Sequence, residues 1–144
     1  MEKSVKDLNS ELENIHVSLS KPFCLSLWEI DSVKDMLIRC VRGVVPFTMR
    51  LDGEDLVYLP PGGGGEELFV AMPVTSGKVQ VSNLIDQVDV VLRGFGKPEY
   101  FTERVLHASV AKTTATPVDG LDDHLQIVSG IVFKAGHRQF AIPF

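Results

Sequence analysis

HASVA, at residues 107–111, is a short stretch in which histidine and serine alternate with apolar residues. Successive side chains of a β-strand point to opposite sides, so this alternation predicts a strand whose two faces differ. His107 and Ser109 share one face, and Ala108 and Val110 share the other. The apolar face suits a hydrophobic core, and the polar face can meet a ligand.

The same pattern occurs near the start of the chain, in HVSLS at residues 16–20. As a strand, this stretch places His16 and Ser18 on one face and apolar residues on the other. Same-face neighbours lie about 6.5–7 Å apart, so a serine hydroxyl can hold a phosphate oxygen while the imidazole reaches an ester oxygen. Two such motifs, each with apolar residues alternating with the histidine and the serine, favour a shared site. The alternative is that each histidine is a half-buried strand residue bonded to a neighbouring hydroxyl.

The composition of the 144-residue chain is typical of one globular domain, with 44% apolar and 23% charged residues. No apolar run is long enough to span a membrane, and the charged N-terminus does not resemble a secretory signal. Cys24 and Cys40 lack zinc or redox spacing, which favours free thiols in a reducing, intracellular compartment. The net charge of −5 argues against a broad nucleic-acid-binding face, but it allows a local cleft that grips one or two nucleotides.

Hydrophobic periodicity predicts the remaining elements. Helices are expected over residues 2–14, over residues 31–43 with Ser32 as cap and Gly43 as stop, and over residues 76–96 with Gly94 or Gly96 at the end. Strands are expected over residues 44–51, 54–59, 66–74 and 104–111, with a closing hairpin formed by residues 125–136 and 137–144. PPGGGG at residues 60–65 is expected to be a loop tip, with a phosphate cradle as the alternative. This order predicts an α+β fold with antiparallel sheets.

A pair of histidines suits phosphodiester cleavage, because an unperturbed imidazole titrates near pH 6.5. At neutral pH one ring can accept the proton of the attacking hydroxyl, and the other can protonate the departing 5′-oxygen. Ser18 and Ser109 would hold the non-bridging oxygens and share the charge that develops on them. This chemistry requires no metal, and His124 and His137 do not form a metal-ligand pattern.

Paired H-x-S-x motifs resemble those of the 2H phosphoesterase superfamily. The stretch from Leu68 to Lys112, with the closing FKAGHRQFAIPF, is similar to the U6 snRNA phosphodiesterase family of poly(U)-trimming 3′–5′ exoribonucleases. HVSLSKPF resembles that family's first motif, so the resemblance runs from about His16 to Phe144. It implies a single domain over residues 1–144, with a two-lobed α+β fold, antiparallel sheets flanked by helices and a central cleft.

The resemblance also implies an activity and a site. The activity is removal of 3′-terminal uridines or adenosines from a single-stranded, oligo(U)-ended RNA in the nucleus, which leaves a 2′,3′-cyclic phosphate or a 3′-phosphate. His16 and His107 carry over as catalytic residues, by analogy the acid and the base, and Ser18 and Ser109 carry over as phosphate-binding residues. In that family an aromatic residue before the second motif stacks on a base. Here Tyr100 is preferred and Phe101 is the alternative, while core packing is the other reading of each ring. No cofactor or metal is implied.

One departure leaves other functions open. The family normally has a strand and a helix before its first motif, whereas fifteen residues precede His16 here, so the first lobe is expected to lack a strand. One alternative function is a 2′,3′-cyclic phosphodiesterase or 2′–5′ RNA ligase-like enzyme, and another is a non-catalytic RNA-binding homologue. Lys21 and Lys112, each five residues after a histidine, are expected to point away from the site. A set of solvated charges that could guide an RNA backbone comprises these two lysines, Lys97, Arg104 and Arg138.

Overall fold

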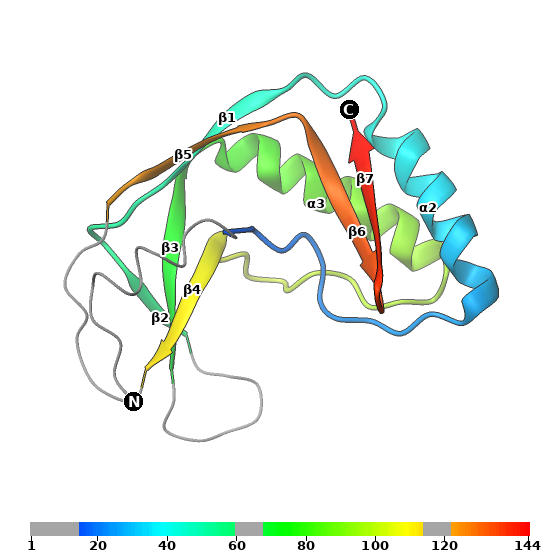
Figure 1. Cartoon of the computed structure of the whole chain (residues 1–144), viewed down its shortest axis with the longest axis horizontal. Helices are drawn as coiled ribbons and strands as arrows, with labels where there is room; N and C mark the ends of the chain where they lie inside the picture. The colour runs from blue at the N-terminus through cyan, green and yellow to red at the C-terminus, as the bar shows by residue number, and fades with distance from the viewer. Residues whose placement is uncertain (1–14, 60–67, 114–121) are drawn as a thin grey trace. The chain divides into compact units, whose positions relative to one another are not determined.

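The protein has an α+β fold in a computed structural model that describes residues 15–59, 68–113 and 122–144 (Figure 1). The strand pairings whose register the structure gives are all antiparallel, which confirms the expected α+β class with antiparallel sheets. The chain divides into two compact units, each assembled from three separate segments. The helix expected over residues 2–14 and the loop at residues 60–65 lie outside the described residues.

The first unit comprises Met1–Ser18, Met49–Lys78 and Val105–Gln126. Its central strand is β3, Leu68–Ser76, which pairs with β2, Val57–Leu59, and with β4, His107–Thr113. β1, Phe47–Leu51, pairs with the end of β3, and β5, His124–Val128, is the neighbour of β1. The buried side chains of this sheet are Met49, Leu51, Val70, Ala71, Met72, Val74 and Ala108.

A β-bulge interrupts the β3–β4 ladder directly after Ser109. Ala71 lies opposite Ser109 while its neighbour Val70 lies opposite Ala111, so position 110 has no partner in the ladder. A bulge adds one residue and shifts the alternation that follows it. The backbone of residue 112 therefore pairs in phase with those of residues 107 and 109. The side chain of Lys112, which was expected to point away from the site, is not among those that the structure describes.

HVSLS does not form the expected strand. Residues 15–18 have no regular secondary structure, and residues 19–20 form a bend. Residues 15–18 belong to none of the strands that form the described sheets. The two-sided character is nevertheless present, since Ile15 and Val17 are half-buried whereas His16 and Ser18 are exposed.

The second unit comprises Leu19–Thr48, Val79–Arg104 and Ile127–Phe144. It contains the helices α2, Leu27–Val41, and α3, Lys78–Gly94, and the hairpin of β6, Gly130–Ala135, with β7, Arg138–Pro143. Both helices and both strands contribute to one hydrophobic cluster, whose buried members are Ile30, Val33, Leu37, Val41, Leu84, Val88, Val91, Leu92, Phe133 and Ile142.

Helix α3 matches the sequence prediction closely. Its apolar stripe, at 3.6-residue spacing, is buried at Val81, Leu84, Ile85, Val88, Val91 and Leu92. The helix ends in a Schellman motif, because the N–H groups of Gly96 and Lys97 donate to the carbonyl oxygens of Arg93 and Leu92 at 3.0 and 2.9 Å. Gly96 occupies the left-handed position of this motif with φ of 70°.

Helix α2 begins at Leu27, four residues before the expected range of 31–43. The N-cap is Ser26 rather than Ser32, and the Ser26 N–H donates to Oε1 of Glu29 at 2.9 Å. The first turn escaped the sequence pattern because Leu27 and Trp28 are 84% and 81% exposed and do not belong to the buried stripe. Gly43 follows the helix with φ of 84°, as expected of a C-terminal stop.

The closing hairpin is shorter than expected. The arm expected over residues 125–136 consists of two strands, because the chain leaves β5 at Ser129 and begins β6 at Gly130. β5 lies beside β1 in its sheet, whereas β6 pairs with β7. The Ser129 carbonyl oxygen accepts a hydrogen bond from the Phe144 N–H at 3.0 Å, which ties this break to the end of β7.

Candidate functional site

The second histidine motif is a two-faced strand, as expected. His107 is the first residue of β4 and lies opposite Pro73, and Ser109 lies opposite Ala71. Ala108 between them is fully buried, whereas Ser109 is exposed and His107 is half-buried. The strand thus holds its apolar side in the sheet core and presents the histidine and the serine on the other side.

The His107 ring is held by the backbone. Its Nδ1 is hydrogen-bonded to the carbonyl oxygen of Val105. A carbonyl oxygen can only accept, so Nδ1 carries the proton and Nε2 of the neutral ring is an acceptor. The next carbonyl, that of Leu106, accepts the Val74 N–H at 2.9 Å and anchors the entry to β4 on β3.

The first motif lies in the same unit as the second. His16 and Ser18 are exposed and belong to the segment Met1–Ser18, which is part of the unit that contains β4. Both histidine motifs therefore belong to one compact unit.

The two aromatic residues before β4 differ in exposure. Tyr100 is half-buried, and burial raises the pKa of its hydroxyl, an effect that Arg104 opposes. Phe101 is 55% exposed, so the reading that it packs in the core is wrong. The rings meet edge to face with centroids 5.4 Å apart, and Nζ of Lys21 lies 4.6 Å from the Phe101 centroid. Phe101 therefore offers more ring surface to a ligand than Tyr100 does.

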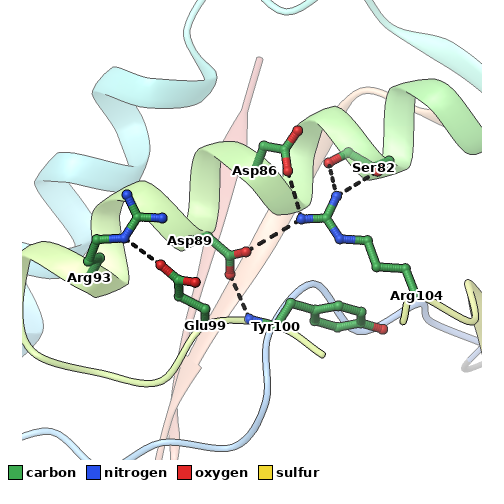
Figure 2. A network of polar contacts seen from close by, with 7 residues as sticks. All are labelled: Ser82, Asp86, Asp89, Arg93, Glu99, Tyr100 and Arg104. Carbon is green, nitrogen blue, oxygen red and sulfur yellow. Dashed lines mark hydrogen bonds and ion pairs between the residues drawn. The ribbon is translucent and has the colours of Figure 1, made fainter. Parts of the chain in front are cut away.

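A polar network joins the segment before β4 to helix α3, as Figure 2 shows. Asp89 is the buried charged residue of α3, and its Oδ1 accepts the Tyr100 N–H at 2.9 Å. Arg104 contacts Oδ2 of Asp89 at 3.5 Å and Oδ1 of Asp86 at 2.6 Å. Arg104 also donates to the Ser82 hydroxyl at 2.6 Å. The sequence carried a signal for this network, because Asp89 is a carboxylate within the apolar stripe of α3.

The chain matches a family model along nearly its whole length, from residue 2 to residue 142. It belongs to the HVSL family. That family is described as an uncharacterised conserved protein, so the match establishes kinship without assigning an activity. Residues 16–19 of this chain read His-Val-Ser-Leu, the four letters of the family's name. No curated protein matches the chain.

The basic residues of this HVSL-family chain are more constrained than expected. Lys21 is half-buried against the Phe101 ring, and Lys97 forms a partly buried ion pair with Glu29 at 3.6 Å. Arg104 is likewise partly buried within its network. These three residues, expected to be solvated surface charges, are only partly exposed, whereas Arg138 is exposed as expected.

In the ranges 15–59, 68–113 and 122–144, no three histidine, cysteine, aspartate or glutamate side chains gather in a way that could hold a metal ion. No helix in these ranges has both the length and the apolar character required to cross a membrane. Cys24 and Cys40 are both free cysteines, and burial raises the pKa of the Cys40 thiol.

Proposed function

We propose that this HVSL-family protein is a metal-independent RNA phosphodiesterase that shortens single-stranded RNA at the 3′ end. The observation that carries the proposal is the hydrogen bond from Nδ1 of His107 to the Val105 carbonyl oxygen. In the neutral ring, this bond leaves Nε2 as an acceptor. Ser109 follows two residues later on the same side of β4 and is exposed. A proton acceptor beside a hydroxyl donor is suited to the attack of a ribose hydroxyl on a phosphate.

The reaction transfers two protons. Nε2 of His107 takes the proton of the penultimate ribose 2′-OH as its oxygen attacks the last phosphorus atom. The bond from phosphorus to the 5′-oxygen breaks, and His16 gives a proton to that oxygen as the terminal nucleoside leaves. The hydroxyls of Ser18 and Ser109 donate to the non-bridging oxygens, where negative charge grows. The shortened RNA keeps a 2′,3′-cyclic phosphate, which water can open to a 3′-phosphate.

Recognition of the terminal base is assigned to the aromatic pair before β4. Stacking of one base on an aromatic ring is worth about 1–3 kcal/mol. Tyr100 and Phe101 both remain proposed stacking residues, and the exposure of Phe101 favours its ring. Stacking is valuable here because the net charge of −5 disfavours binding through the RNA backbone alone. Uridine and adenosine ends are the proposed substrates, and U6 snRNA 3′-end processing in the nucleus is the proposed role.

Two other functions fit parts of the same site. A 2′,3′-cyclic phosphodiesterase or 2′–5′ ligase-like enzyme would use the same two histidines and serines on another substrate. A non-catalytic RNA-binding homologue is favoured by one observation, since His16 lies on a segment without regular secondary structure. Product length and histidine substitution separate these possibilities from 3′ trimming.

The test is incubation of the purified protein with a 5′-labelled RNA that ends in oligo(U), in the presence of EDTA. We expect the parent protein to shorten the RNA one nucleotide at a time, and His16→Ala and His107→Ala to leave it intact. His137→Ala is the matched control, because His137 is an exposed residue in the β6–β7 turn and should trim like the parent.

Other results contradict the proposal in distinct ways. Loss of trimming in EDTA would indicate a metal-dependent nuclease. Opening of a cyclic phosphate without shortening of the RNA would indicate the cyclic phosphodiesterase. Binding of RNA by the parent and by both histidine variants, without any product, would indicate the non-catalytic homologue.

A further inference from the structure

The segment between α3 and β4, residues 97–106, carries both proposed stacking rings and leads directly into His107. It has no helix or strand structure, with only a bend at residues 102–103. Backbone N–H groups in such a segment need partners outside regular secondary structure. The contacts that hold this segment therefore decide where Tyr100 and Phe101 lie.

Asp89 holds the segment at two points. Its residue surface is 7% exposed, which is unusual for a carboxylate, and both oxygens have partners. Oδ1 accepts the Tyr100 N–H at 2.9 Å, and Oδ2 lies 3.5 Å from Nη2 of Arg104. A buried carboxylate is costly unless it is paired, so these two contacts are the reason that it can occupy this position.

Arg104 extends the attachment along the helix. Its guanidinium contacts Asp86 Oδ1 at 2.6 Å, the Ser82 hydroxyl at 2.6 Å and the Ser82 carbonyl oxygen at 3.1 Å. Together with Asp89, these residues lie on one face of α3, since they are spaced by four and three positions. Figure 2 shows the guanidinium reaching this face while the Tyr100 backbone turns toward Asp89.

We propose that Asp89, acting with Arg104, is a positioning residue that holds Tyr100 and Phe101 in the orientation needed to grip the terminal base. Asp89 touches no reacting atom, and its effect passes through the Tyr100 backbone. The two rings pack edge to face, at an interplanar angle of 80°, so the position of Tyr100 also determines the position of Phe101. The inference rests on the proposed function, because it assigns the determinant of base binding at that same site.

The closing experiment uses Asp89→Ala and the milder Asp89→Asn, with trimming measured on RNAs that end in oligo(U) and in oligo(C). An asparagine oxygen can still accept the Tyr100 N–H, so Asp89→Asn preserves the backbone contact and weakens the one to Arg104. We expect Asp89→Ala to raise KM for oligo(U) by about 5-fold or more, as for a lost stacking contact, with a smaller change in kcat. The ratio of kcat/KM between oligo(U) and oligo(C) should fall toward one, and Asp89→Asn should lie between the parent and Asp89→Ala.

A double-mutant cycle separates positioning from a loss of stability. In a Tyr100→Ala, Phe101→Ala background, a residue that acts through the rings should no longer change KM, whereas a structural defect would still lower activity. Asp35→Asn, an exposed aspartate on α2, removes the same charge and should match the parent. Circular dichroism at the assay temperature confirms folding, and Asp89→Asn carries the test if Asp89→Ala unfolds.

The outcomes also distinguish this inference from the proposed function. If the parent trims RNA but the Asp89 variants keep the parent KM and base preference, the positioning role is wrong and the proposed function stands. If the parent does not trim, the proposed function is wrong, and the Kd for oligo(U) measured by fluorescence anisotropy replaces KM. A parent that neither trims nor binds overturns both.

Discussion

Nδ1 of His107 donates a hydrogen bond to the backbone carbonyl oxygen of Val105, two residues earlier in the chain. This contact selects one tautomer of the neutral ring, with the proton on Nδ1 and the lone pair on Nε2. It involves the main chain of residue 105, so substitutions of the Val105 side chain do not remove the acceptor. The backbone at the start of β4 therefore fixes the tautomer of the proposed base.

The first prediction concerns that tautomer. In a long-range ¹H–¹⁵N NMR spectrum at mildly alkaline pH, the His107 ring should show a protonated Nδ1 and an unprotonated Nε2. The spectrum of His107→Asn identifies the signals by their loss. Protonation of Nε2 in the neutral ring would contradict the hydrogen bond to Val105 and would remove the basis for His107 as the base.

The second prediction concerns two glycines at the end of α3. A Cβ would meet no atom within 4 Å at Gly94 or at Gly96, but only Gly96 has a left-handed backbone, with φ of 70°. Gly94→Ala should stabilise the protein by about 0.5 kcal/mol, because alanine is the better helix former. Gly96→Ala should destabilise it by about 1 kcal/mol, because an L side chain is strained at that φ. Urea denaturation measures both, and shifts of the same sign would contradict this account.

The third prediction concerns the close approach of the two strands of the hairpin. A Cβ on Gly130 would lie 2.6 Å from the Ile142 carbonyl oxygen and 3.1 Å from the Pro143 Cα, both of them backbone atoms of β7. Gly130→Ala should therefore destabilise the protein by about 1–3 kcal/mol, as overpacking typically does. The measurement is the thermal unfolding temperature of Gly130→Ala, compared with those of the parent and of Gly94→Ala. A Gly130→Ala protein as stable as the parent would show that the hairpin is not packed this closely.

The fourth prediction concerns acid stability in the first unit. Arg50 donates to Oδ2 of Asp123, with its Nε at 3.1 Å, and the Gly53 N–H donates to Oδ1 at 2.9 Å. The hydrogen bond from Arg50, followed by that from Gly53, lowers the pKa of the Asp123 carboxyl. The stabilisation is therefore present above the unfolded-state pKa, near 4, and is lost as the pH falls through the lower folded-state pKa.

Asp123→Asn should accordingly be less stable than the parent at pH 7, and the difference should shrink as the pH falls below about 4. Urea denaturation at a series of pH values measures this convergence. Asp122→Asn is the control, because Asp122 is an exposed neighbour of the same type and charge. A stability difference that is independent of pH would show that the Arg50 and Gly53 contacts do not act through the carboxylate charge.

Helix α3 and strand β4 were predictable because their signals are local. The stripe from Val81 to Leu92 repeats with the helical period, and a glycine follows where the helix must stop. In β4 the alternation around Ala108 is enough to divide the strand into a buried and an exposed side. The same local logic failed at α2, where the exposed Leu27 and Trp28 in the first turn do not continue the buried stripe.

The chain's own residue pattern determined the helix periods, the sidedness of the histidine motifs and the α+β class, because each depends on neighbours close in sequence. Tertiary structure alone decided that residues 15–18 form no strand, that β4 carries a bulge after Ser109, and that Asp89 is buried against Tyr100 and Arg104. Strand pairing and carboxylate burial require partners that are distant in sequence. Local periodicity does not show which distant backbone group or guanidinium will contact a given residue.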